Sequence, residues 1–489
     1  MRSRLQILLL LLAAAAAPAC GGRQALPSDE APADGPAKAP PLRRYRFSRA
    51  AGQDAQGFYY QPTGLADDYP EETTTPEKIA RDFEAMSAAG VKVFRFAFGW
   101  DSIEARPGEF DFRLWDEVVA ASIRHDITLI PYVCYTPRWL SADPEDFWRS
   151  PPSDPARFGQ FMEVIVRRYK GTIHAWELWN EPDNRDFWLG DVDAFAALLR
   201  EGARGVRRAD PGAVIVLGGL TQWPEGAFLE ALLERHGAAT WLDVINLHGY
   251  AGTWDSRPET DYPARIAATA ALLPRGGPDL WMAELGYASD RPASGAPTTC
   301  GVAPAAAHER TPAYQAVQLF KHHVLALAPG RLSLTAWYRI HDLPGGEAVI
   351  GDACNRHLGI LDERGRPKPA FQALKHYNRL FDLPARSADT RVRVRAQEGS
   401  RAEIHAFEEN DGGLLVVGWL RPRAAAGSAV APDAGREVVT VTLPDAGYRR
   451  LAVHDAIGGP GPAGAALADG ALTAVELRAD GLFIAELRR

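Results

Sequence analysis

The sequence contains little cysteine and none of the common motifs for metal or cofactor binding. Only 4 of its 489 residues are cysteine, and no spacing of cysteine and histidine is typical of a metal site. The HExxH pattern of zinc hydrolases and the GxSxG pattern of serine hydrolases are both absent from the chain. We therefore expect no metal and no cofactor, and we look for catalysis by ordinary side chains.

The chain also lacks an excess of positive charge. Its 54 lysines and arginines are outnumbered by 62 aspartates and glutamates, which gives a formal net charge of −8. Proteins that bind nucleic acids need a basic surface that neutralises the phosphates. The composition therefore argues against a nucleic-acid partner.

Long hydrophobic runs are scarce as well. The apolar run from Leu5 to Ala17 follows two arginines and ends in "APAC" at residues 17–20, and it is too short to cross a membrane comfortably. We interpret residues 1–20 as a signal peptide, with an end that resembles a bacterial lipobox. That resemblance implies that Cys20 is lipidated and that the chain is anchored at a bacterial membrane, in the outer membrane or at the cell surface. An ordinary signal peptide and a periplasmic or secreted protein are the alternative.

Residues 21–42 are rich in alanine, proline and aspartate, which is typical of a flexible linker. Because export permits disulfide bonds, Cys300 and Cys354 could pair. Three free thiols, including Cys134 in an apolar run, are the alternative, since the sequence cannot give connectivity. The oligomeric state is left open.

From about residue 76 to 380, short apolar runs alternate with helical patterns, as in right-handed parallel βα units. Hydrophobic residues make up 46% of the chain, enough for a large core. We expect a first strand near 43–60 and seven further strands at 91–99, 127–135, 173–181, 214–219, 243–250, 279–286 and 333–340. Eight such units predict an α/β fold with a (β/α)8 TIM barrel at residues 43–385.

After about residue 388 the pattern changes to alternation with a period of two, as in "RVRVRA" and "EVVTVTL". This pattern predicts a C-terminal antiparallel β-sandwich domain at residues 386–489. No row of exposed aromatic residues is evident in it. We therefore favour a sandwich that packs on the barrel over one that binds carbohydrate.

Side chains of a barrel strand alternate between the interior and the helix layer, so polarity can be tested against parity. On this basis five strands direct polar groups inward, toward the end where barrel enzymes have their active sites. Asn180 has the outer parity and reaches this site only if its strand ends or bulges. The expected inward set comprises Arg95, Glu177, Trp179, Glu181, Asn246, His248, Tyr250, Met282, Glu284, Thr335, Trp337 and Arg339.

Two carboxylates that face each other across a barrel mouth fit glycoside hydrolysis, because one can attack the anomeric carbon while the other protonates the leaving oxygen. Glu181 and Glu284 form this pair, and a retaining enzyme needs them about 5 Å apart. Hydrogen bonds from Arg95 and Tyr250 would keep one carboxylate ionised, whereas the other, next to Trp179, would have a raised pKa. Glu177 lies deeper and is expected to be a buried structural carboxylate.

The motifs "WNEP" at 179–182 and "AELG" at 283–286 resemble the acid/base and nucleophile motifs of clan A retaining glycoside hydrolases, most closely family 39, with family 5 next. Residues 95–112 and 358–375 resemble further segments of these enzymes, and the likeness covers about residues 55–380. The resemblance implies that Glu181 is the acid/base and Glu284 the nucleophile.

The same resemblance implies that Asn180 binds the 2-hydroxyl of the sugar, and that the subsite for the cleaved sugar is lined by Arg95, His248, Tyr250 and Trp337. Trp100 and Trp179 are further candidates for binding substrate, although tryptophans that only pack are nearly as common. Asp183 stands where family 39 often has asparagine, which leaves the family itself open between 39 and 5.

The expected function is a retaining glycosidase that acts on an oligo- or polysaccharide, either β-xylosidase-like or an endo-hydrolase of a polysaccharide. As the substrate we favour a pentoside or a uronide, because family 39 includes β-xylosidases and α-iduronidases. Two alternatives are a catalytically inactive, glycan-binding surface lipoprotein and a transglycosylase. The inactive form should have lost one of the two glutamates, and both are present.

Overall fold

The structure is a computed structural model that describes residues 52–223, 226–254, 262–290, 309–345, 349–350, 353–421 and 435–489. The predicted signal peptide and linker, with Cys20, lie outside these ranges, as does Cys300. Among the helices in the described ranges, none has the length and apolar character needed to cross a membrane.

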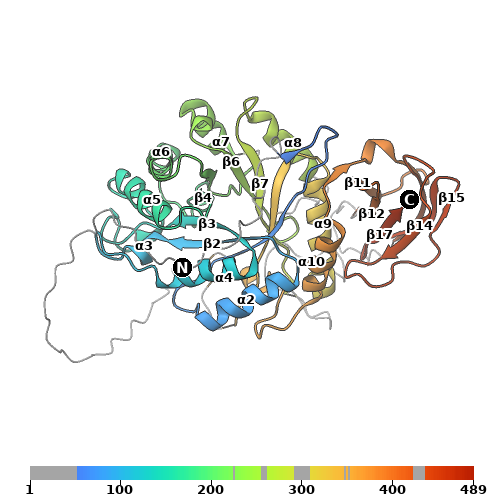
Figure 1. Cartoon of the computed structure of the whole chain (residues 1–489), viewed down its shortest axis with the longest axis horizontal. Coiled ribbons are helices and arrows are strands. Elements are labelled where there is room, and N and C mark those ends of the chain that lie inside the picture. The colour runs from blue at the N-terminus through green and yellow to red at the C-terminus, as the bar shows by residue number, and fades with distance from the viewer. Residues whose placement is uncertain are drawn as a thin grey trace, which may run out of the picture. The chain divides into compact units, whose positions relative to one another are not determined.

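Eight parallel strands close into a barrel in chain order, as the sequence predicts (Figure 1). Seven of them lie within or next to the predicted runs. The barrel strands are β1 (Thr63–Asp67), β2 (Val93–Gly99), β3 (Thr128–Cys134), β4 (Ala175–Leu178), β5 (Val214–Leu217), β6 (Val244–Gly249), β7 (Asp279–Leu285) and β8 (Leu332–Tyr338).

The first strand differs from the prediction. It is β1, "TGLAD", at residues 63–67, and the described part of the predicted region, residues 52–60, contains only an isolated bridge from Tyr59 to Ala385. A short strand with glycine and without a run of β-branched residues gives little periodic signal.

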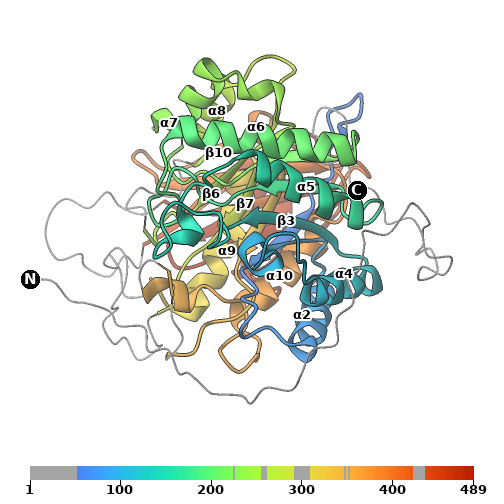
Figure 2. The same ribbon diagram turned by 90° about the vertical axis from the view of Figure 1, so that its left-hand side faces the viewer.

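Helices surround the barrel, and Figure 2 shows α2, α4, α5 and α6 on the outside of the strands. The first of them, α2, begins with a capped end: the Thr75 side chain accepts a hydrogen bond from the Lys78 amide, and Pro76 is the first helical residue. The helices are α2 (Pro76–Ala88), α3 (Trp100–Ile103), α4 (Arg113–His125), α5 (Ala156–Arg168), α6 (Val192–Ala209), α7 (Ala227–Glu230), α8 (Tyr262–Leu272), α9 (Pro312–Leu327) and α10 (Pro369–Leu380).

The barrel interior contains a small apolar cluster below the polar site. Val93 of β2, Ala175 of β4 and Val244 of β6 belong to it, while Phe94, Phe96 and Phe98 pack in the outer core. The predicted parity is therefore correct in β2, in β4 as far as Leu178, and in β6. The whole inner cluster is Val93, Ile130, Ala175, Val216, Val244, Trp281, Ala283 and Leu334.

The predicted parity is wrong in the first half of β7. Trp281 points inward and Met282 lies in the outer core, the reverse of the expectation. The pairing with β6 then shifts by one residue, because Asn246 pairs with Trp281 but His248 pairs with Glu284. This bulge carries Glu284 to the inner face.

The predicted parity is also wrong in β8. Leu334 belongs to the inner cluster, whereas Thr335 contacts His323 of α9 at 3.0 Å and Trp337 packs against His322 and His323. A strand that is buried on both faces offers no polarity contrast from which to read its register.

The C-terminal region forms a sandwich of two antiparallel sheets, as predicted. Their orders are β10-β13-β16-β15 and β14-β17-β12-β11-β9, and side chains from both sheets share one apolar core. The strands are β9 (Ala385–Ser387), β10 (Arg393–Arg395), β11 (Ala402–Glu409), β12 (Leu414–Leu420), β13 (Arg436–Thr442), β14 (Arg450–His454), β15 (Ala466–Ala468), β16 (Ala471–Arg478) and β17 (Phe483–Arg488).

Candidate active site

The chain turns sharply just after β4, and this turn places the first glutamate. β4 ends at Leu178, and both Trp179 (φ 77°) and Glu181 (φ 43°) have positive φ values, which are uncommon for residues with a side chain. The ending strand explains the parity exception: Asn180 faces the barrel mouth, and its Oδ1 accepts a hydrogen bond of 2.8 Å from Arg95.

Glu181 and Glu284 lie across the barrel mouth from each other, with His248 of β6 between them. His248 Nδ1 is 2.7 Å from Glu181 Oε1 and 3.3 Å from Glu284 Oε2. One oxygen of each glutamate and a nitrogen of His248 all lie within 4.8 Å of one another. The two carboxylates are therefore close enough to act on one bond.

Arg95 is the central cation of the site. Its Nη1 donates to Glu284 Oε1 at 2.5 Å, while Nε and Nη2 donate to the two oxygens of Glu177 at 2.7 and 2.8 Å. The guanidinium thus bonds both a deep carboxylate and the predicted nucleophile. Because it is 1% exposed, its charge acts at short range with little screening by water.

Glu177 is fully buried and has the structural role that its position predicts. Besides Arg95, it accepts hydrogen bonds from the Gly219 amide at 3.0 Å and from Asn246 Nδ2 at 3.1 Å. Asn246 Oδ1 in turn accepts from the Ala283 amide. This network connects β2, β4, β6, β7 and the end of β5.

The two glutamates have different surroundings, and this separates their chemistry. Burial raises the pKa of Glu181 from its ordinary 4.5 to about 7, against the opposing effects of a hydrogen bond from Asn184 and the charge of Arg95. Burial also raises the pKa of Glu284, but His248, Arg95 and a hydrogen bond from Tyr250 oppose that rise. Glu181 is thus poised to hold a proton, and Glu284 is the better supported anion.

His248 is neutral near pH 7, because burial lowers its pKa to about 4. The position depends on Gly219: a Cβ there would lie 1.9 Å from His248 Nε2. The backbone carbonyl of His248 also accepts a hydrogen bond from Trp223. The contact of the ring with Gly219 and the hydrogen bond to the backbone together fix the position of His248.

Three tryptophans predicted to bind substrate do not line this site. Trp100 is fully buried, donates to Glu104 and packs against Phe158 and Phe161. The turn after β4 takes the Trp179 ring into an aromatic cluster with Trp188. Trp337 lies on the outer face of β8, where it packs against His322 and His323 of α9. All three pack in the outer core.

The structure adds three residues to the rim that the sequence analysis did not identify. Asp68 follows β1 directly, and its two carboxylate oxygens accept hydrogen bonds from Tyr132 and Tyr338 at 2.9 and 2.7 Å. Tyr338 was missed because the register of β8 was assigned to the wrong face, and Asp68 because β1 was placed too early. The pair "DD" at the end of a strand was the signal that could have indicated it.

Glu181, His248 and Glu284 also form the one group of possible metal-ligating side chains found in the described ranges. Arg95 already compensates the charge of Glu284, and Glu181 has a pKa near neutrality, so the charge balance of the group does not require a cation.

The two cysteines in the described ranges differ in their oxidation state. Cys134 is free and buried, and burial raises the pKa of its thiol well above the ordinary value. Cys354 is disulfide-bonded. Its pairing with Cys300 stays a prediction, because Cys300 lies outside the described ranges.

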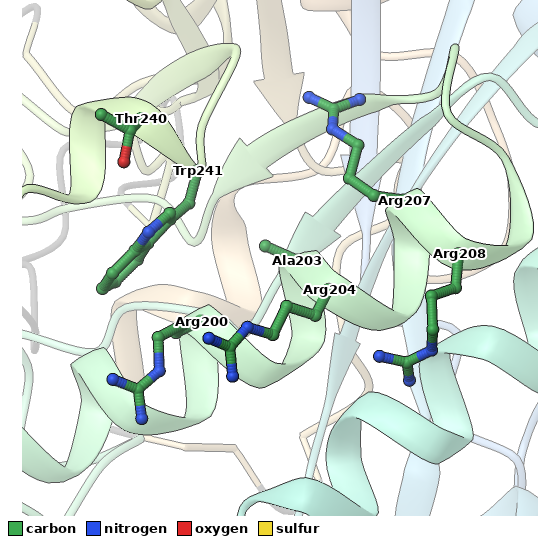
Figure 3. Close-up of a pocket in the computed structure, with 7 residues that line it drawn as sticks. All are labelled: Arg200, Ala203, Arg204, Arg207, Arg208, Thr240 and Trp241. Atoms are coloured by element: carbon green, nitrogen blue, oxygen red, sulfur yellow. The ribbon is translucent and has the colours of Figure 1, made fainter.

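A separate hollow lies on the outer side of the barrel, away from the glutamates. In Figure 3 arginines project from α6 and Trp241 stands opposite. All four of these arginines are paired with acids: Arg200 and Arg204 with Glu201, Arg207 with Asp243 and Arg208 with Glu163. Because these charges are compensated, we assign no catalytic role to this hollow, which is lined by Arg200, Ala203, Arg204, Arg207, Arg208, Thr240 and Trp241.

Comparisons with known proteins agree with this geometry. The family described as cellulase (glycosyl hydrolase family 5) matches residues 53–296, about half of the chain. An endo-1,4-beta-xylanase B of Paenibacillus barcinonensis is 25% identical over 152 residues, which is 29% of this chain and 44% of that enzyme. The match thus spans less than half the length of that relative.

Solved structures of similar fold cover most of the chain. A family 39 glycoside hydrolase from Bacteroides cellulosilyticus matches 88% of this chain and 81% of its own, with 17% identity and a TM-score of 0.64. A family 39 beta-xylosidase from Caulobacter crescentus matches 92% and 98%, with 17% identity and a TM-score of 0.56. A family 30 xylanase from Clostridium acetobutylicum matches 88% and 96%, with 12% identity and a TM-score of 0.58.

The matched family and the enzymes of similar fold all belong to one clan. The chain is therefore similar to clan A glycoside hydrolases, in sequence over residues 53–296 and in fold over most of its length.

Proposed function

We propose that the protein is a retaining glycoside hydrolase that cleaves O-glycosidic bonds by double displacement. The observation that carries this proposal is the spacing of Glu181 and Glu284, whose nearest carboxylate oxygens lie within 4.8 Å. A retaining mechanism needs carboxyl groups about 5 Å apart, whereas an inverting mechanism needs about 6.5–9.5 Å to admit a water molecule.

In the first step Glu284 attacks the anomeric carbon while Glu181 gives its proton to the departing glycosidic oxygen. This forms a bond between the sugar and Glu284 and releases the leaving group as an alcohol. In the second step Glu181 takes a proton from water, whose oxygen attacks the anomeric carbon, and Glu284 departs as a carboxylate. Glu181 is protonated again, which closes the cycle.

Neighbouring groups support each role. Arg95 and Tyr250 donate hydrogen bonds to Glu284, so they stabilise the anion before attack and after departure. The raised pKa of Glu181 keeps it protonated at mildly acidic pH. Asn180, held by Arg95, can bind the 2-hydroxyl of the bound sugar.

For the substrate we propose a β-xyloside or a xylan-like polysaccharide, because similar proteins are described as an endo-1,4-beta-xylanase and a beta-xylosidase. The test is a panel of aryl glycosides and polysaccharides with the wild type, Glu181→Gln, Glu284→Gln and the exposed control Glu234→Gln. Both site variants should lose roughly 1,000-fold or more in kcat/KM, and the control should match the wild type. The first product, followed by NMR, should keep its anomeric configuration.

An inverted product would contradict the retaining mechanism. Wild-type rates in both site variants on every cleaved substrate would contradict the assignment of the residues. A 2-fluoroglycosyl adduct on a residue other than Glu284 would overturn the nucleophile alone.

We further propose that the chain is exported and anchored through a lipid on Cys20, on the sequence pattern of residues 1–20. Cells that express the full chain should incorporate labelled palmitate into it and retain it in the membrane fraction. Cys20→Ser should abolish both. A soluble, unlabelled wild type would identify an ordinary signal peptide instead.

A further inference from the structure

Asp68 stands at the rim of the barrel with its carboxylate held in place. Tyr132 of β3 donates to one oxygen and Tyr338 of β8 to the other, at 2.9 and 2.7 Å. Arg339 Nη1 lies 3.9 Å from Asp68 Oδ2. The side chain is still 43% exposed, so it is accessible to a ligand although its orientation is fixed.

The two tyrosines make Asp68 a hydrogen-bond acceptor. Each phenol has a single proton, and each donates it to one oxygen of Asp68. The carboxylate oxygens have further lone pairs, which can accept hydrogen bonds from a ligand. A neighbouring ion pair fixes the backbone: Asp67 accepts from Arg339 and from the Asp68 amide, each at 2.8 Å. The acceptor is thus built into the junction of β1 and β8.

This acceptor adjoins the catalytic pair. The ring of Tyr338 lies 6.3 Å from the ring of Tyr250, and Tyr250 bonds Glu284. The ring of Tyr132 lies 4.1 Å from the guanidinium of Arg95. The charge of Asp68 is also one of the influences that raise the pKa of Glu181. A sugar held between the two glutamates therefore lies beside Asp68.

The charge at this rim is unsuitable for an acidic sugar. Arg95 and Arg339 are both buried and already bonded to carboxylates. Asp68 and Glu284 add negative charge that faces the bound sugar. A uronate would place a further carboxylate beside them, and the repulsion between like charges at close range would oppose its binding.

We propose that Asp68 is a specificity-determining residue, which accepts a hydrogen bond from a hydroxyl of a neutral sugar in the subsite of Glu181 and Glu284 and excludes uronic acids. This inference rests on the proposed function and narrows its substrate class to neutral glycosides.

The test compares Asp68→Asn with Asp186→Asn at pH 5.5. Asp186 is exposed and, like Asp68, raises the pKa of Glu181, so its variant controls for the loss of one nearby charge. On a neutral aryl glycoside that the wild type cleaves, Asp68→Asn should lower kcat/KM roughly 10- to 100-fold, while Asp186→Asn stays within about twofold. The loss should vanish on the one monodeoxy analogue that lacks the bonded hydroxyl.

The matching aryl uronide should be cleaved by the wild type roughly 100-fold less well or not at all. Equal rates for Asp68→Asn and the wild type on all neutral substrates, or a wild-type preference for the uronide, would overturn the inference.

A binding measurement separates this inference from the proposed function. Calorimetry on the Glu181→Gln variant should show binding of a neutral xylo-oligosaccharide but not of an oligosaccharide with a uronate as its terminal non-reducing sugar, and added Asp68→Asn should weaken the binding of the neutral form. If no substrate is cleaved but this pattern holds, the catalytic proposal fails and the role of Asp68 stands. If binding is absent or insensitive to Asp68, the inference fails.

Discussion

At the residue scale, the site depends on two glutamates whose environments differ in one cation. Arg95 bonds Glu284 directly, whereas Glu181 is bonded by the neutral amide of Asn184 at 2.9 Å and lies 2.7 Å from the neutral His248. Burial raises the pKa of both glutamates, but only at Glu284 does a direct hydrogen bond from Arg95 oppose the rise, and the pKa of Glu181 reaches about 7. This asymmetry is the basis for proposing Glu181 as the proton donor and Glu284 as the nucleophile.

The first prediction concerns the alkaline limb of catalysis. Because the acid must be protonated, kcat/KM should fall as pH rises through about 7, the pKa of Glu181 in the folded protein. Asn184→Ala removes a hydrogen bond that lowers this pKa, so the limb should move to higher pH. Asp186→Asn removes a charge that raises the pKa, so the limb should move to lower pH. Shifts of the same sign in pH–rate profiles of the two variants would contradict the assignment.

The second prediction concerns the seat of His248. Gly219→Ala places a Cβ 1.9 Å from His248 Nε2, so the imidazole must leave its position between the glutamates. We expect kcat/KM to fall about 100-fold, because displacements of about 1 Å in a catalytic group have effects of this size. Gly212→Ala, where the nearest atom is 3.6 Å away, is the control. An activity of Gly219→Ala that equals the wild type would mean that His248 tolerates the change, and an equal loss in both variants would mean that the loss does not arise at His248.

Polarity made several site residues predictable from sequence. Arg95, His248 and Tyr250 alternate with apolar residues in strands whose outer faces contact helices, and the structure brings them together with both glutamates. Their roles stay predictions. Trp179 could not be predicted, because its position follows from a turn with positive φ that the motif "WNEP" does not reveal.

At the element scale, a bulge in β7 places Glu284, the proposed nucleophile. Asn246 and His248 are two residues apart in β6, but their partners Trp281 and Glu284 are three apart in β7. A regular strand would have put either Trp281 or Glu284 on the helix side. The sequence "WMAEL" contains no glycine or proline that marks this irregularity, so periodicity placed Glu284 correctly and Trp281 wrongly.

The third prediction concerns the contact between α5 and α6. Glycines allow these helices to approach closely, since a Cβ on Gly205 would lie 2.0 Å from the Gly159 carbonyl oxygen. Gly205→Ala should therefore separate the helices and lower the free energy of unfolding by about 1–3 kcal/mol. Urea denaturation measures the change, with Gly212→Ala again as the control. Helix propensity alone would make Gly205→Ala more stable than the wild type. That result would show that the two helices can move apart at little cost to accommodate the added methyl group.

At the scale of the whole molecule, the (β/α)8 barrel and the sandwich were both predictable, because each has a long periodic pattern. Closure of the barrel was less certain, since β1 has only five residues and little periodicity. It is fixed by pairing with both β2 and β8, and such distant contacts leave no trace in the local sequence.

The fourth prediction concerns stability at acid pH. Burial lowers the pKa of His322 and His323 of α9 to about 3, while the unfolded chain has ordinary histidines near 6.5. The unfolded state then binds more protons, so stability is full above about pH 6.5 and is lost as pH falls toward 3. Thermal melts between pH 7 and 4 should show a falling Tm, and His322→Phe should reduce the slope.

Burial also opposes a proton on His405, but Asp389 and Glu403 reverse this effect and raise its pKa to about 9. Its contribution has the opposite sign: it is full below about pH 6.5 and is lost as pH rises through 9. His405→Gln therefore serves as the counterpart, since it should leave the acid slope unchanged. An acid slope that is the same in His322→Phe and the wild type would contradict the assignment.

The hydrogen bonds of Glu177 have a last consequence for how catalysis begins. Glu177 of β4 bonds Arg95 of β2, Asn246 of β6 and the amide of Gly219 after β5. These hydrogen bonds connect four neighbouring parts of the barrel at the same level. Under the proposed mechanism, the charges that would stabilise an oxocarbenium-like sugar are therefore in place before the substrate binds. The conformational change on binding would then occur in the sugar ring of the substrate rather than in these side chains.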